Sequence, residues 1–290
     1  MGQSLRRMNR NQSPNGVNKY KRLKRNFPLS NLKETFPDLS ELPPEIGLAV
    51  LSNLNATDLC LAACVNEFWQ ELANDQLLWQ GLCRATWGCV SAYEQDRTDE
   101  PGFSWKGLYL QLDEASLSFS ADAQLGLDYL FRHNLVDNNP LAIAQFIHTT
   151  NTLHHWQVRK FLQKRSDVLE ELVGLDNYAN HFLPNALRTF FSHVETPNER
   201  GPYLQTLIEM FAKKFISCNK DCKLTVETIS VLCYSLILLS VDLTSPKVKN
   251  KMSKREFIRN LRQATQIDDE FSGHLYDNIY LVGHIAPQKW

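Results

Sequence analysis

Residues 225–260, TVETISVLCYSLILLSVDLTSPKVKNKMSKREFIRN, decide the fold, because a long apolar run stops abruptly there and a basic segment follows. Within residues 229–241 apolar side chains occupy nearly every helical face, which predicts a helix that is buried all round. The run is too short to cross a bilayer, which takes roughly 20 apolar residues. Asp242 is expected to end this helix. Pro246 is expected to open a second, basic helix, because proline is tolerated at a first helical position.

Helical patterns also fill the chain upstream of this stretch. Segments such as FSADAQLGLDYLFRHNLV (119–136) and NPLAIAQFIHTTNTL (139–153) carry apolar residues at helical spacing, with short polar breaks between them. The sequence shows no sustained alternation of apolar and polar residues, which is the pattern of a half-buried strand. It therefore predicts an all-α fold, built as an array of packed helices.

Residues 225–260 resemble the second signature of the Sec-seven domain, the catalytic module of guanine-nucleotide exchange factors for ARF-type small GTPases. The matching positions lie in the apolar helix, at its end and in the basic segment: Val231, Leu232, Ile237, Leu238, Leu239, Asp242, Leu243, Pro246, Val248, Lys249, Lys251, Met252, Phe257, Ile258, Arg259 and Asn260. The resemblance covers residues 117–283. It implies a right-handed array of helices and an ARF-family small GTPase as partner.

The segment NALRTFFSHVETPNE (185–199) resembles the first signature of the same domain, and its glutamate falls on Glu199. The resemblance implies that this carboxylate enters the nucleotide site of the GTPase. There its charge repels the β-phosphate and competes for Mg²⁺, so that bound GDP is weakened without a covalent step. Glu199 is therefore the candidate catalytic residue, as a displacing acid. From local sequence alone, the alternative is a solvated charge at a loop tip.

The implied GTPase-binding set draws on both signatures: Pro197, Asn198, Leu239, Ser240, Asp242, Leu243, Thr244 and Met252. Several polar positions differ from the family pattern. Asn198 stands where Gly is usual, and Ser240 and Thr244 stand where Asn and His are usual. Residues 201–202, Gly-Pro, lengthen and stiffen the loop after Glu199. Because nucleotide displacement depends on placement to within about an ångström, these differences favour binding of the GTPase over exchange.

Residues 42–79, LPPEIGLAVLSNLNATDLCLAACVNEFWQELANDQLLW, show the spacing of three short helices. Pro43 or Pro44 suits the start of the first helix, and Thr57 is a good N-cap for the second. A segment of about 40 residues cannot bury a stable core unaided. We therefore expect it to lean on the rest of the chain or on a partner.

The same segment resembles the F-box, which implies docking on the Skp-family adaptor of a cullin-RING ubiquitin ligase. The implied adaptor-binding set is apolar, as the centre of a protein interface usually is. It comprises Leu42, Pro43, Ile46, Leu51, Leu54, Leu59, Val65 and Trp69. A plain helical subdomain without a partner is the alternative interpretation.

The expected order of domains is a basic tail (1–38), the F-box (39–85), a connector (86–116), the Sec-seven-like domain (117–283) and a short tail (284–290). Residues 1–34 hold nine Lys or Arg and one acidic residue, although the net charge of the whole chain is −1. Their shortage of apolar residues predicts disorder. This tail is either simply solvated or, with an acyl group on Gly2 beside its basic cluster, in peripheral contact with a membrane.

The seven cysteines make an odd set in a chain whose basic start is not followed by an apolar signal segment. This predicts free thiols in a reducing compartment, and thus a cytoplasmic protein, peripheral at membranes if the tail is acylated. The pairs Cys60/Cys64 and Cys218/Cys222 have no His pair downstream, and the histidines show no ligand spacing. We expect no metal site, no cofactor and no nucleic-acid partner.

Two functions remain open at this point. In the first, the chain is an F-box substrate receptor that presents an ARF-family GTPase for ubiquitylation, with no ubiquitin-transfer chemistry of its own. In the second, it is primarily an ARF exchange factor that regulates ARF signalling, and the F-box is a regulatory docking element. The F-box segment favours the first function and Glu199 favours the second. A purely structural helical scaffold is a third interpretation.

Overall fold

The computed structural model describes residues 43–94, 102–194 and 201–286, and its regular elements in these ranges are all helices, with one isolated bridge between Trp87 and Thr150. The first helices are α1 (Pro44–Leu51), α2 (Ala56–Ala62), α3 (Glu67–Ala73) and α4 (Gln76–Thr86), followed by a 3₁₀ helix at Ser91–Tyr93. The middle of the chain forms α5 (Trp105–Ala121), α6 (Ala123–Arg132), α7 (Pro140–Thr149), α8 (His155–Leu162) and α9 (Ser166–Leu175). The last helices are α10 (Leu183–His193), α11 (Pro202–Cys218), α12 (Val226–Thr244), α13 (Lys254–Ala264) and α14 (Asp269–Val282). The all-α prediction is confirmed.

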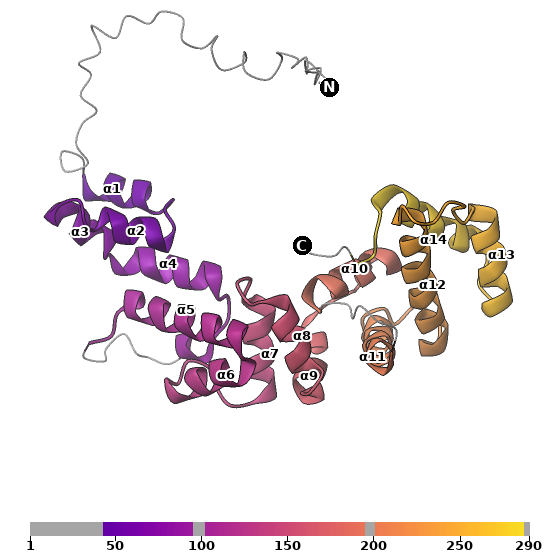
Figure 1. The fold of residues 1–290 in the computed structure, drawn as a ribbon, viewed down its shortest axis with the longest axis horizontal. Coiled ribbons are helices and arrows are strands. Elements are labelled where there is room, and N and C mark those ends of the chain that lie inside the picture. Colours follow the sequence, from indigo (N-terminus) through magenta and orange to yellow (C-terminus); the bar gives the residue numbers. More distant parts are fainter. Residues whose placement is uncertain (1–42, 95–101, 195–200, 287–290) are drawn as a thin grey trace, which may run out of the picture.

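The helices form an elongated body in which α1–α3 lie at one end and α12–α14 at the other (Figure 1). Helices that follow one another in the chain pack together, among them α5 with α6, α11 with α12 and α13 with α14. Tight packing of α5 on α6 depends on Gly126. A Cβ atom at this position would lie 2.4 Å from the Cα atom of Phe119.

The three helices predicted for residues 42–79 are present as α1–α3, and a fourth helix, α4, follows them. Each helix after the first begins at a polar cap: Asn55, Asn66 and Asp75 accept hydrogen bonds from backbone N–H groups of α2, α3 and α4. The N-cap of α2 is thus Asn55 and not Thr57. We call α1–α4 the N-terminal module. Its small core contains Leu51, Leu59, Ala62, Leu72, Ala73, Leu78 and Trp79.

The N-terminal module packs against the rest of the chain through the contact of α4 with α5. The ring of Tyr109 meets the edges of Trp79 and Trp87, with ring centroids 5.3 Å and 4.9 Å apart. The Trp105 backbone N–H donates to Gln76 Oε1 at 2.9 Å. Lys106 Nζ donates to the side-chain oxygen of Asn74 at 2.8 Å. Aromatic edge contacts of this kind contribute about 1 kcal/mol each beyond area burial. Together with the two hydrogen bonds, they join the N-terminal module to the rest of the chain.

The predicted boundary between connector and second domain, at residues 116–117, lies inside α5. Apolar residues at helical spacing, such as Leu108, Leu112, Ala115 and Phe119, run through this boundary and are buried. The connector therefore supplies most of a core helix. The predicted tail at 284–290 also begins with packed structure, because Ile285 is fully buried. The basic tail predicted for residues 1–38 lies outside the described residues.

The apolar run at 229–241 forms the middle of α12, which packs against α10, α11, α13 and α14. The whole of α12, with 19 residues, is long and apolar enough to cross a membrane, unlike the run 229–241 alone, but its packing against these four helices is that of a core helix. The prediction of burial on all sides is wrong, because Leu238 and Val241 are 45% and 46% exposed. Asp242 does not end the helix, which continues to Thr244.

No helix begins at Pro246; the next one, α13, begins at Lys254. Its start is determined by a capping box, in which Ser253 accepts from the Glu256 backbone N–H and Glu256 accepts from the Ser253 backbone N–H. Such a reciprocal cap gives hydrogen-bond acceptors to two backbone N–H groups at the helix start that have no acceptor within the helix. Pro202, in contrast, occupies the first position of α11 and is compatible with a regular helix there.

Candidate partner-binding surfaces

Around the end of α12, five residues stay at least partly exposed, and we call them together the α12 face: Leu238, Val241, Leu243, Thr244 and Met252. Leu238 and Val241 are three residues apart and therefore share one side of the helix. Thr244 is exposed, and Leu243 and Met252 are half-buried. Three of these residues were in the predicted GTPase-binding set. Leu238 and Val241 were not in that set, because an apolar run on every face gives no sign of which side stays uncovered.

Two predicted contact residues, Leu239 and Ser240, lie beneath the surface, with exposed fractions of 1% and 0%. The Ser240 hydroxyl donates to the Ile237 carbonyl oxygen at 2.9 Å, so its polar group is satisfied inside the helix. Neither side chain offers surface to a partner in this conformation. We correct their role to support of the α12 face.

Asp242, also predicted to bind the GTPase, holds the connection between α12 and α13. Its Oδ2 atom accepts a hydrogen bond from the Met252 backbone N–H at 2.7 Å. Lys251 Nζ donates to the carbonyl oxygens of Asp242, at 2.7 Å, and Ser245. The Tyr276 hydroxyl donates to the Met252 carbonyl oxygen at 2.9 Å. These bonds place Met252 beside the end of α12, so that the connection extends the α12 face.

The residues implied by the first signature, Pro197, Asn198 and Glu199, lie outside the described residues. The structure describes their flanks. α10 ends at His193, and Val194 after it is buried at 1% exposure. α11 begins at Pro202 after an extended Gly201. The assignment of Glu199 as a displacing acid, and of Pro197 and Asn198 as contacts, therefore stays a prediction.

The N-terminal module also leaves apolar side chains exposed on two of its helices. Ile46 and Val50 on α1 are each 49% exposed, and Leu61 and Val65 at α2 are each 63% exposed. We call these four residues the module face. Ile46 and Val65 were predicted, whereas Val50 and Leu61 were not, although both continue the apolar spacing of their helices.

The other predicted adaptor contacts divide by depth. Pro43 is exposed, and Leu54 and Trp69 are half-buried against the module's core. Leu51 and Leu59 are each 1% exposed, because they form that core. Their predicted role as direct contacts is corrected to internal packing. Leu42 lies outside the described residues.

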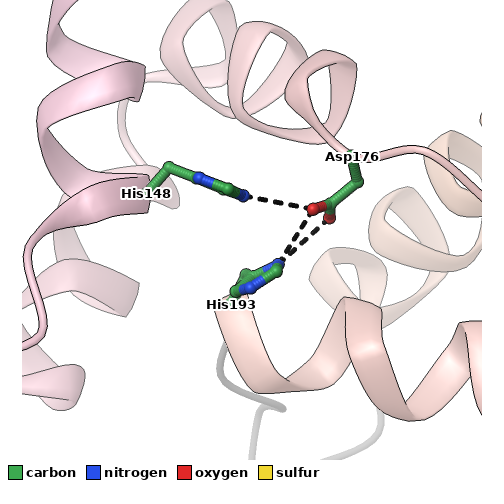
Figure 2. Close-up of side chains that lie close together, drawn as sticks. All are labelled: His148, Asp176 and His193. Carbon is green, nitrogen blue, oxygen red and sulfur yellow. Dashed lines mark hydrogen bonds and ion pairs between the residues drawn. The ribbon is translucent and has the colours of Figure 1, made fainter. Parts of the chain in front are cut away.

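A third cluster, which no sequence pattern indicated, joins two histidines to a buried carboxylate. Figure 2 shows His148 at the end of α7, Asp176 after α9 and His193 at the end of α10, with both rings directed at the carboxylate. His148 Nε2 lies 3.1 Å and His193 Nδ1 lies 3.0 Å from Asp176 Oδ1. The Tyr178 hydroxyl donates to Asp176 Oδ2 at 2.7 Å.

Asp176 is ionised in this cluster. Burial alone would raise the pKa of this carboxyl, but hydrogen bonds from His148, His193 and Tyr178 outweigh it and hold the pKa well below its ordinary value. Burial also raises the pKa of Tyr178, which therefore stays a neutral hydroxyl donor. Among the described residues, this is the group of His, Cys and acidic side chains close enough to hold a metal ion.

Comparison with known proteins agrees with the two-part organisation. A model of the F-box-like family matches residues 39–85, and a model of the Sec7 domain family matches residues 109–281. The second match covers more than half of the chain, and together they define a protein that joins an F-box-like segment to a Sec7 domain. The proteins named F-box only protein 8 of Mus musculus and Homo sapiens are each 53% identical over 282 residues, which span 96% of this chain and 86% of theirs. The chain belongs to the F-box only protein 8 family.

Solved Sec7 domains share the fold of the second part. The crystal structure of the Sec7p catalytic domain superposes with a TM-score of 0.54 at 27% identity, covering 59% of this chain and 96% of that one. A Sec7 domain bound to ARF1-GDP and brefeldin A gives a TM-score of 0.56, covering 60% of this chain and 92% of that one. At 20% identity, the second likeness concerns the fold alone.

Proposed function

We propose that the protein is a substrate receptor of a cullin-RING ubiquitin ligase: its N-terminal module binds the Skp-family adaptor, and its Sec7 domain binds an ARF-family small GTPase. The observation that carries the proposal is the placement of two exposed apolar surfaces, the module face and the α12 face, at opposite ends of one elongated helical body (Figure 1). Two partners can occupy these ends together without competing for space.

On the adaptor side, the module face has the character of an interface centre. Its four aliphatic side chains are about half exposed or more. Complete burial of these side chains against a partner is favourable by roughly 1 to 2 kcal/mol each, because about half of each is already covered in the free protein. The small core beneath, with Leu51 and Leu59, keeps the face in shape.

The adaptor contact is tested by co-purification of the full chain with the Skp-family adaptor. Val65→Asp introduces a charge at a side chain that is 63% exposed, so the fold should tolerate it. We expect the complex to be lost or weakened by at least about tenfold, because a buried unpaired charge costs well over 1.4 kcal/mol. Leu117→Asp on α5, at a leucine that is 65% exposed, is the matched control and should bind normally. Unchanged binding of Val65→Asp would exclude the module face.

On the GTPase side, the α12 face combines exposed apolar residues with an ordered connection. A solved Sec7 domain is bound to ARF1-GDP, and the second part of this chain has that fold. The matching signature residues of this chain run from α12 through the connection into α13. The hydrogen bonds of Asp242 and Lys251 hold this connection in one arrangement, which lowers the entropic cost of binding.

Direct binding to purified ARF proteins tests this contact, with GDP-loaded and nucleotide-free forms compared. Val241→Glu, at a side chain that is 46% exposed, should reduce the affinity at least about tenfold while thermal stability stays within a few degrees. Leu117→Glu serves again as the control. Binding that survives Val241→Glu at full strength would move the GTPase contact away from α12.

The second candidate function, nucleotide exchange, is favoured by one observation. Glu199 follows the first-signature helix α10 within the segment that links it to α11, which is where the family places its displacing acid. GDP release from purified ARF proteins, followed with a fluorescent nucleotide, distinguishes the two functions. A receptor without exchange activity leaves release at the spontaneous rate with wild type and Glu199→Lys alike. Acceleration that disappears in Glu199→Lys would make exchange the primary function.

A further inference from the structure

We propose that His148, Asp176 and His193 form a binding site for a single transition-metal ion of the zinc class, with a fourth coordination position open to solvent. The three residues come from α7, the segment after α9, and the end of α10 (Figure 2). Its three residues are not among those of the α12 face or the module face, although His193 lies within the first-signature segment 185–199.

The spacing of the donor atoms fits tetrahedral coordination. Zinc binds imidazole nitrogen and carboxylate oxygen at about 2.0 to 2.2 Å, which puts neighbouring donor atoms of a tetrahedron about 3.3 Å apart. The nitrogens of His148 and His193 lie 3.1 Å and 3.0 Å from Asp176 Oδ1, and all three donor atoms lie within 4.8 Å of one another. Small outward movements of two side chains would therefore admit an ion.

The chemistry of the donors selects the class of metal. Two imidazoles and one carboxylate suit Zn²⁺, Co²⁺, Ni²⁺ and Cu²⁺, whereas Ca²⁺ and Mg²⁺ prefer sites made entirely of oxygen. Asp176 offers a carboxylate oxygen within 3.1 Å of a ring nitrogen of each histidine. Three protein ligands leave a fourth position, as in zinc sites that keep a water molecule.

The surroundings orient the donors before any ion binds. Asp176 has a side-chain exposure of only 7%, and the Tyr178 hydroxyl fixes its second oxygen. Such an outer partner is typical of ligating carboxylates in metal sites. The side chains of His148 and His193 are 25% and 30% exposed, so an ion can approach from solvent. Since the ligands come from separate helices, a bound ion would cross-link α7 to α10 and stabilise the folded chain.

The test uses the full chain, stripped of metal with a chelator and kept reduced so that its cysteines stay free thiols. Zinc alone is titrated by calorimetry, and the unfolding temperature is measured with and without zinc. We expect one ion per chain and a higher unfolding temperature with zinc. His148→Gln and His193→Gln keep a hydrogen-bond donor toward Asp176 and should weaken zinc binding by at least about 100-fold. His274→Gln, at an exposed histidine outside the cluster, is the control and should bind as wild type does.

Cobalt provides a measurement that needs no variant. Co²⁺ bound to nitrogen and oxygen donors shows weak visible bands and no intense thiolate charge-transfer band in the near ultraviolet. An intense thiolate band would assign the ion to cysteines and overturn the proposal. Equal zinc affinity in the two cluster variants, or an unfolding temperature of wild type that zinc leaves unchanged, would overturn it as well.

Discussion

A single carboxylate, that of Asp242, helps to hold the connection that completes the α12 face. Its Oδ2 atom is the acceptor for the Met252 backbone N–H. Without this acceptor, the connection between α12 and α13 loses the hydrogen bond that brings Met252 back to the helix end. Residues that shape a binding surface from within are therefore distinct from residues that touch a partner.

Asp242→Ala should lower the free energy of unfolding by about 2 kcal/mol, because a half-buried N–H loses a charged acceptor. Urea unfolding followed by circular dichroism measures this change. Asp221→Ala is the control, since Asp221 is exposed in the segment after α11, and its effect should stay within about 0.5 kcal/mol. Equal effects of the two variants would mean that the bond to Met252 contributes nothing measurable.

Arg188 performs a comparable task at the end of α14. Its guanidinium donates to Asn278 Oδ1 at 2.7 Å, to the Gly283 carbonyl oxygen at 2.9 Å and to the His284 carbonyl oxygen at 3.3 Å. A lysine ammonium at this position lacks the planar fork and cannot reach all three acceptors.

Arg188→Lys should therefore loosen residues 283–286 and cost about 1 to 2 kcal/mol of stability. Hydrogen exchange at the backbone of these residues should become faster, while exchange in α5 stays unchanged. Arg132→Lys, at an exposed arginine at the end of α6, should change neither quantity. Unaltered exchange at residues 283–286 in Arg188→Lys would show that Ile285 alone anchors this segment.

At the scale of elements, the close packing of α5 on α6 depends on the absence of a side chain at Gly126. The position of Gly126 brings the backbone of α6 against that of α5 at Phe119, with no space for a Cβ atom. Gly174, in α9, is also helical but has no neighbouring atom within 4 Å of its ideal Cβ position. The two glycines thus offer a comparison in which only packing differs.

Gly126→Ala should force α5 and α6 apart and destabilise the protein by about 1 to 3 kcal/mol. Gly174→Ala should leave stability unchanged or raise it by up to about 1 kcal/mol, because alanine restricts the unfolded chain and favours helix. Thermal unfolding of both variants side by side measures the difference. A Gly126→Ala protein as stable as wild type would mean that the helix pair can relax without loss.

Much of the helical organisation could be predicted from the spacing of apolar residues, and some of its details could not. Residues 229–241 predict a buried helix, because apolar side chains fill successive turns. The same uniformity conceals that Leu238 and Val241 face outward, since their neighbours in the chain are equally apolar. The start of α13 was misplaced at Pro246, because a proline only permits a helix start, whereas the reciprocal bonds of Ser253 and Glu256 stabilise one.

The candidate sites were predictable to different degrees, because the sequence gives the order of residues but not their burial. Signature residues in continuous segments, such as Asp242 to Met252, could be located from their order alone. Whether Leu239, Ser240, Leu51 and Leu59 contact a partner depends on burial, which only packing determines. The cluster of His148, Asp176 and His193 was invisible in the sequence, because its members are brought together by the packing of three separate segments.

At the scale of the whole molecule, Tyr109 joins the N-terminal module to the rest of the chain. Its ring contacts both Trp79 of the module and Trp87 beyond it. This contact fixes the orientation of the module face relative to the rest of the chain, which a flexible linker would not do. A substrate receptor built in this way would hold a bound GTPase in one orientation relative to the ligase.

Tyr109→Ala should uncouple the two parts. Wild type is expected to unfold in one cooperative transition, and the variant in two, with the small N-terminal module unfolding first. Calorimetry measures the unfolding transitions. Small-angle scattering measures whether the overall dimensions of the variant become larger or more heterogeneous than those of wild type. A single transition in Tyr109→Ala, at a temperature close to that of wild type, would show that the remaining contacts of Trp105 and Lys106 suffice.

The shared contact of α4 and α5 also decides where the chain can be cut. An expression fragment that begins at residue 109 or 117, as a family match or a pattern boundary suggests, would start inside α5 and lack both Trp79 and Trp87, which contact Tyr109 in the whole chain. Such a fragment would leave the remaining part of α5 without the packing of α4, and the newly exposed apolar surface would tend to self-associate. Workers who need the Sec7 domain alone should retain α4 and begin upstream of Asp75, whose carboxylate caps that helix.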